Sequence, residues 1–105
     1  MPYAEPLSPQ DVERLLADLP GWSVSADGKT LATTYHLAHL PAAIFALHIA
    51  GIQAELNHHS DLTLGYDTLA VALTTHAAGS RLTAKDFTLA QRIADIAPGH
   101  GAASA

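Results

Sequence analysis

Apolar residues recur at helical spacing in three stretches of the chain, and shorter alternating stretches lie between them. The first helical pattern begins after Ser8 and runs to Leu19, where a Pro-Gly pair stops it. The second opens at Pro41 and carries a broad apolar stripe over about four turns. The third follows a capping-box pattern at 83–86 and ends before Pro98. The sequence therefore predicts three amphipathic helices.

Two pairs of strands are predicted between these helices. Residues 22–24 should turn at Asp27 and Gly28 into a return strand at 31–37. Residues 61–66 and 69–76 form a second pair with a tight turn near Asp67. Strand pairs joined by tight turns favour antiparallel pairing. The expected fold is α+β: a four-stranded antiparallel sheet with three helices packed on one face, in the order α-β-β-α-β-β-α.

Length and composition limit the domain organisation and the classes of partner. A chain of 105 residues with 49% apolar and 14% charged residues suits one domain, here residues 1–98, with a flexible tail at 99–105. The formal charge of −5 and the absence of a Lys/Arg cluster argue against direct binding of nucleic acid. The chain has no cysteine, no secretory signal and no apolar run of about 18 residues. We therefore expect a cytoplasmic protein that contacts no membrane.

The second face of the predicted sheet suggests self-association. It carries small residues such as Ala70 and Ala72, with Thr74 and His76 on the same side. Solvent or a second subunit must cover any apolar area that remains on this face. An oligomer is therefore expected.

Three histidines are the main candidates for chemistry. His58 and His59 lie where the second helix should end, and His76 closes the last predicted strand. Imidazole has an ordinary pKa of about 6.5, so it can donate or accept a proton at neutral pH. Two simpler functions remain open. The adjacent histidines can cap helix carbonyls, and Asp86 at the third position of its helix can serve only as a cap.

A three-histidine metal site is a further alternative, because neutral imidazoles suit zinc or iron. The spacing does not favour it. Adjacent residues of a helix point about 100° apart, so His58 and His59 converge on one ion only if the chain leaves the helix between them.

Several residues taken together resemble the signature of the pterin-4a-carbinolamine dehydratases. They are Asn57, His58, His59, Tyr66, Thr75, His76 and Asp86. The Leu-Pro-Gly-Trp segment at 19–22 and the segment LTAKDFTLA at 82–90 are also similar, so the resemblance covers nearly the whole chain. It implies the α+β fold expected above, a homodimer or homotetramer, and removal of water from 4a-hydroxytetrahydropterin to give quinonoid dihydropterin. It implies no metal and no organic cofactor.

The resemblance also assigns roles. Hydroxide is a poor leaving group, so an acid must protonate it while a base takes the N5 proton. His58 and His76 are the expected acid/base pair, and His59 is expected to orient the pterin. The expected substrate-binding residues are Asn57, Ser60, Thr75 and Asp86. The Asp86 carboxylate is also expected to tune His76.

Three positions depart from the family pattern. Ser60 replaces the usual proline, and Leu62 stands where some members carry tryptophan. Ala54 stands where many carry glutamate, with Glu55 one place later. These changes leave a second function open: a non-catalytic scaffold that acts as a dimerisation or assembly cofactor. The retained histidines favour the enzyme, with an aromatic amino acid hydroxylase as the expected partner in pterin recycling.

Overall fold

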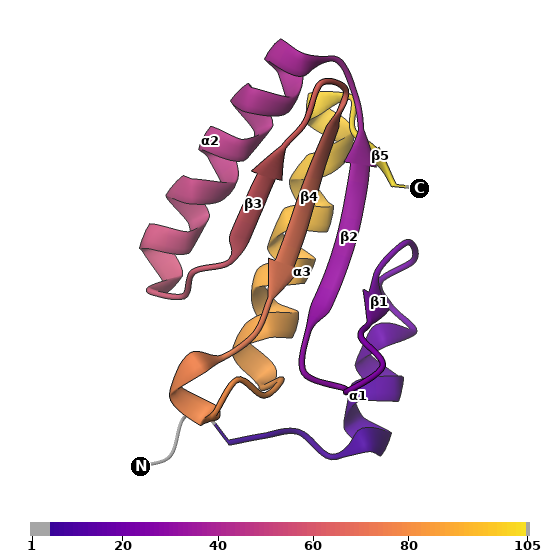
Figure 1. Cartoon of the computed structure of the whole chain (residues 1–105), viewed down its shortest axis with the longest axis vertical. Helices are drawn as coiled ribbons and strands as arrows, with labels where there is room; N and C mark the ends of the chain where they lie inside the picture. The colour runs from indigo at the N-terminus through magenta and orange to yellow at the C-terminus, as the bar shows by residue number, and fades with distance from the viewer. Residues whose placement is uncertain (1–4, 105) are drawn as a thin grey trace.

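The structure, a computed structural model, describes residues 5–104 (Figure 1). Its helices are α1 (Pro9–Leu16), α2 (His39–Leu56) and α3 (Ala84–Ile96). Its strands are β1 (Ser23–Val24), β2 (Leu31–His36), β3 (Asp61–Leu64), β4 (Thr68–Leu73) and a short β5 (Ala103–Ser104). Two 3₁₀ turns are η1 (His76–Ala78) and η2 (Ala97–His100). Up to α3, the helices and strands follow the order α-β-β-α-β-β-α, so the predicted fold class is confirmed.

All strand pairs of the sheet are antiparallel, in the order β1-β2-β4-β3. The central strands β2 and β4 pair along their full length, from Leu31 opposite Leu73 to His36 opposite Thr68. Strand β3 pairs with the other side of β4. The short strands β1 and β5 pair with opposite ends of the remaining edge of β2. The α2–β3 connection thereby lies beside the end of β4.

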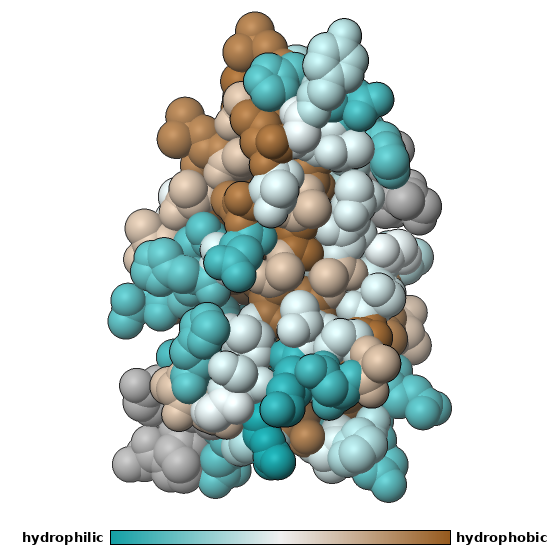
Figure 2. All heavy atoms as spheres, in the orientation of Figure 1, coloured by the Kyte–Doolittle hydropathy of each residue, from teal (hydrophilic) through white to brown (hydrophobic). Residues whose placement is uncertain are grey.

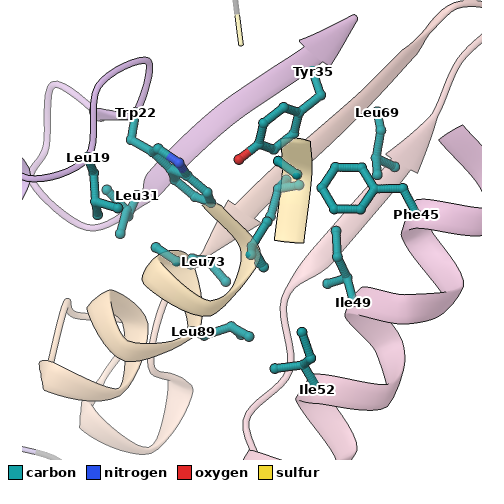
Figure 3. Close-up of a cluster of buried hydrophobic side chains, with 14 of the residues drawn as sticks. Leu19, Trp22, Leu31, Tyr35, Phe45, Ile49, Ile52, Leu69, Leu73 and Leu89 are labelled. Atoms are coloured by element: carbon teal, nitrogen blue, oxygen red, sulfur yellow. The ribbon is translucent and has the colours of Figure 1, made fainter. Parts of the chain in front are cut away.

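One face of the sheet and the helices enclose a single apolar core (Figure 3). Alternate residues of β2 and β4 point into it, among them Leu31 and Leu69, which are fully buried. Phe45 of α2 packs edge-on against Tyr35, with ring centroids 5.1 Å apart. Leu89 of α3 is fully buried in the same cluster, and α1 contributes partly buried residues. Burial of each large apolar side chain stabilises the fold by about 1.5–3 kcal/mol.

Two helix boundaries differ from the sequence pattern. Helix α1 ends at Leu16, and from Asp18 the amides bond to the carbonyl three residues earlier instead of four. Asp18 N–H donates to Leu15 O at 3.2 Å, and Leu19 N–H donates to Leu16 O at 3.0 Å. This tightening brings Leu19 into the core. Helix α2 begins two residues before Pro41. Proline is tolerated there because amides of the first turn have no partner within the helix.

The C-terminal segment makes contacts with β2 and α2. Ala103 and Ser104 pair with the end of β2. The His100 ring stacks on Phe45 at 4.9 Å between centroids, and its Nε2 atom lies 2.8 Å from Nδ1 of His48. The flexibility expected for residues 99–105 stays a prediction, as does the domain boundary at residue 98.

The surface combines an open sheet face with an apolar patch on α2. The open face carries small, half-buried side chains of β2 and β4, and it faces the viewer in Figure 2 as pale residues. Leu40, Ile44 and Leu47 of α2 are 69%, 51% and 74% exposed, and brown spheres gather over this helix in Figure 2. Within residues 5–104, no helix has the length and apolar character needed to cross a bilayer.

Candidate functional site

A small hollow on the open face of the sheet brings together two of the three candidate histidines. It has a volume of about 70 Å³. Its lining residues come from the α2–β3 connection, from β3, from the end of β4 and from η1: His59, Ser60, Asp61, Ala72, Thr74 and His76. The polar lining suits a ligand edge that carries hydrogen-bonding groups.

The end of α2 places the adjacent histidines in different environments. Asn57 caps the helix in the left-handed conformation, with φ 51°, which asparagine adopts more readily than most residues. The chain therefore leaves the helix before His58 and turns. The His58 ring is buried, with 8% exposure, whereas His59 is exposed and lines the hollow. The helix end that the sequence predicts before the histidine pair is confirmed.

A closed turn after β4 presents His76. Backbone bonds link Thr75 and Arg81 in both directions, at 3.1 and 3.4 Å, and so hold the ends of the turn together. The turn reverses through Gly79 and Ser80, both at positive φ. Ser80 Oγ lies 3.4 Å from His76 Nδ1. His76 therefore sits on a 3₁₀ turn beyond the strand, rather than at the strand end that the alternation predicts.

The Asp86 carboxylate is the centre of a buried hydrogen-bond network. Asp86 has no exposed surface. Its Oδ1 atom lies 2.7 Å from His58 Nε2. Its Oδ2 atom accepts hydrogen bonds from the Thr75 hydroxyl at 2.7 Å and from the Thr83 backbone N–H at 2.9 Å. The last bond is half of the predicted capping box, which is confirmed.

This network fixes the chemical form of His58. Oδ2 already accepts two hydrogen bonds, and a carboxylate can only accept, so the proton between Oδ1 and the ring is assigned to His58 Nε2. The proton exchanged with any other group must then be held at Nδ1. A carboxylate that holds an imidazole in one tautomer and orientation is a common arrangement behind an acid/base histidine.

The structure corrects one expectation about this network and leaves another untested. Asp86 was expected to tune His76, but it binds His58 instead. The reason is geometric: Thr75 is buried and bonds Asp86, whereas the next side chain, His76, is exposed. Thr75 and Asp86, both expected to bind substrate, have buried side chains that bond each other. Their contact with substrate stays a prediction.

The sequence interpretation missed three of the lining residues: Asp61, Ala72 and Thr74. The Thr74 hydroxyl is buried and, among the described residues, is the one buried side-chain polar atom without a hydrogen-bond partner. A buried hydroxyl without a partner costs about 1–3 kcal/mol. The alternation of β4 contained the signal, because Thr74 shares the open face with Ala72.

The remaining expected residues lie around the hollow. Ser60 lines it, although its hydroxyl and N–H both donate to Gln53 Oε1. Asn57 is exposed at the helix cap. Glu55 points away from the hollow and forms two hydrogen bonds with Arg92 of α3, at 2.9 and 3.2 Å. The Arg92 guanidinium lowers the pKa of the Glu55 carboxyl. Glu55 therefore joins α2 to α3.

Other hollows of the structure are larger, and two of them contain no histidine. One of about 390 Å³ lies between α1 and α3, and one of about 580 Å³ lies beside α1 and the first hairpin. His58 lines a separate hollow of about 190 Å³ with Leu56, Ala84, Lys85 and Thr88. In the described part of the chain, no three His, Cys, Asp or Glu side chains are grouped so as to hold a metal ion.

Comparison with known proteins identifies relatives across nearly the whole chain. Residues 5–96 match the family model described as pterin 4 alpha carbinolamine dehydratase. A Streptomyces coelicolor protein named "Putative pterin-4-alpha-carbinolamine dehydratase" is 56% identical over 100 residues, which cover 94% of this chain and 97% of the relative. A Chloroflexus aggregans protein of the same name is 41% identical over 91 residues, covering 86% and 95%.

Two solved structures share the fold at low sequence identity. A transcriptional coactivator/pterin dehydratase from Brucella melitensis superposes with a TM-score of 0.81 at 22% identity, covering 87% of this chain and 97% of the other. A pterin dehydratase-like protein, described as a RuBisCO assembly factor in the alpha-carboxysome, gives a TM-score of 0.61 at 14% identity, covering 71% and 87%. At these identities the likeness concerns the fold alone.

Proposed function

Because this chain belongs to the pterin 4 alpha carbinolamine dehydratase family, we propose that it removes water from a 4a-hydroxytetrahydropterin to give quinonoid dihydropterin. The observation that carries the proposal is the shared hollow, where His59 and His76 meet from segments far apart in the sequence. Acid/base chemistry needs groups that exchange protons near neutral pH. His76 lines this hollow, and His58, the residue before His59, lines a separate one.

The proposed reaction assigns one task to each histidine. The departing 4a-hydroxyl takes a proton and leaves as water, while the N5 proton passes to a base. His76 and His58 are the proposed acid/base pair, and His59 is proposed to orient the pterin. Each proton transfer by a positioned group contributes typically about 10²–10⁴-fold. The Asp86 carboxylate holds His58 in the tautomer that exchanges its proton at Nδ1.

The size of the hollow determines how the substrate would lie. Its volume of about 70 Å³ is well below the roughly 300–1,000 Å³ of ordinary ligand pockets. It therefore accommodates one edge of a two-ring pterin, with the Thr74 side chain in its lining. We place the rest of the substrate along the connection that carries His58 and His59.

Stopped-flow measurement of dehydration tests the proposal. The native chain should accelerate loss of water from 4a-hydroxytetrahydropterin, and His76→Ala and His58→Ala should each lower kcat by about 10²–10⁴-fold. Gln91→Leu is a matched control, because Gln91 is exposed on α3 and bonds Asp95 away from the hollow. Dehydration at the uncatalysed rate in the folded native chain would refute the enzyme.

That negative outcome would favour the alternative function. The chain would then be a scaffold that serves as a dimerisation or assembly cofactor. The two proteins of the same fold are described as a transcriptional coactivator/pterin dehydratase and as a RuBisCO assembly factor. If the chain is active, we propose that it recycles the oxidised pterin of an aromatic amino acid hydroxylase. We further propose that it is cytoplasmic and forms a homodimer or homotetramer.

A further inference from the structure

The residue that follows the histidine pair is tied to the interior of α2. Gln53 is buried, with 6% exposure. Its Oε1 atom accepts the Ser60 backbone N–H at 2.6 Å and also accepts the Ser60 hydroxyl. A backbone N–H can only donate, so the atom facing it must be the amide oxygen of Gln53. Two donors from one residue thus converge on one buried acceptor.

Gln53 also holds the other end of the same connection. Its backbone carbonyl oxygen accepts the His58 N–H at 3.1 Å, just past the left-handed Asn57. The backbone carbonyl of Gln53 therefore holds His58, and the side chain of Gln53 holds Ser60. His59 itself is exposed. The position of its ring at the hollow consequently depends on where these two bonds hold its backbone.

We propose that Gln53 and Ser60 form a clamp that positions His59 at the hollow. This inference deepens the proposed function and rests on it for the catalytic effect. Gln53 is a positioning residue, since it lines none of the hollows described above and acts through the backbone on either side of His59. The Ser60 N–H is essential to the clamp, so a residue without an N–H at position 60 would leave the buried Gln53 oxygen with fewer donors.

Four variants separate positioning from simple support of the fold. Gln53→Leu removes the acceptor, and Ser60→Pro removes both donors. Gln53→Glu keeps an acceptor oxygen at the same distance from the helix and is the conservative rescue. The double variant Gln53→Leu/Ser60→Pro removes the interaction from both sides, so that no buried polar partner is left. Gln91→Leu again provides a control glutamine on another helix.

Two quantities are measured for each variant: the rate constant of dehydration and the NMR signals of the His59 ring. We expect Gln53→Leu and Ser60→Pro each to lower kcat by about 10–100-fold, because a displacement of about 1 Å costs up to 10²-fold. The loss in the double variant should be less than the product of the single losses, which is the mark of a direct interaction. Gln53→Glu and Gln91→Leu should stay within about threefold of the native kcat.

The NMR readout keeps the clamp testable if the proposed reaction fails. His59 ring signals should shift in Gln53→Leu and Ser60→Pro and should return toward native positions in Gln53→Glu, whatever the catalytic activity. Unchanged His59 signals in folded Gln53→Leu would overturn the clamp. A lower melting temperature with native kcat and native His59 signals would also overturn it, because the pair would then only support the fold.

Discussion

Replacement of Asp86 by asparagine tests the central network without changing its shape. The amide oxygen of asparagine can keep both bonds of Oδ2, from the Thr75 hydroxyl and the Thr83 N–H. Its NH₂ group then faces His58 Nε2, where Oδ1 accepts a bond at 2.7 Å in the native chain. Because the amide donates, His58 must become the acceptor at Nε2 and carry its proton at Nδ1. The variant therefore reverses the tautomer.

The cost in stability follows from the count of bonds. Asp86→Asn should lower the free energy of unfolding by only about 1–2 kcal/mol, because charge-assisted bonds become neutral ones. Asp86→Ala removes the bonds to His58, Thr75 and Thr83 and leaves their buried donors unsatisfied. It should cost about 3–5 kcal/mol. That is a large part of the roughly 5–15 kcal/mol expected for a domain, so the asparagine variant is the one to assay.

Three measurements check this prediction. Urea unfolding gives the stability, ¹⁵N NMR of the ring nitrogens gives the His58 tautomer, and stopped flow gives kcat. We expect a folded Asp86→Asn protein with the reversed tautomer and a kcat lower by about 10²–10⁴-fold. A reversed tautomer with native kcat would show that His58 transfers no proton in the reaction. A loss of more than about 3 kcal/mol would contradict the proposed retention of the Oδ2 bonds.

Three further predictions follow from other parts of the structure. Thr74→Val should leave the melting temperature unchanged or slightly higher, because the native hydroxyl has no partner among the described residues. The same variant should raise KM for the pterin. A lower melting temperature with an unchanged KM would contradict the placement of Thr74 in the substrate site. Arg92 lowers the pKa of the Glu55 carboxyl in the folded chain. The pair should therefore contribute its whole stabilisation at a pH above the carboxyl pKa of the unfolded chain. This contribution should be lost as the pH falls through the lower pKa of the folded chain. Melting curves should therefore show the native chain and Glu55→Gln converging on acidification, while a constant difference would argue against the pair. Leu47→Glu should reduce the mass measured by light scattering, because Leu47 is 74% exposed on the apolar face of α2; an unchanged mass would exclude this face from the proposed oligomer contact.

The sequence by itself determined the three helices, the strands β1 to β4 and their order, but not the two 3₁₀ turns or β5. Alternation along β2 and β4 assigned each residue to the buried or the open face, and the capping box at Thr83 located the start of α3. These signals are local, because side-chain direction in a strand and the hydrogen bonds at a helix end depend on residues close in sequence. The family resemblance, also read from the residues, is confirmed by the matched relatives.

Only the tertiary structure decided which groups meet. It paired Asp86 with His58 rather than with His76, turned the Thr75 hydroxyl inward and left the Thr74 hydroxyl at the hollow without a protein partner. The bonds from Gln53 to both sides of His59 also depend on the exact turn taken after Asn57. Such contacts join segments whose relative position is set by the packing of α2, α3 and the sheet, and no local pattern records that packing.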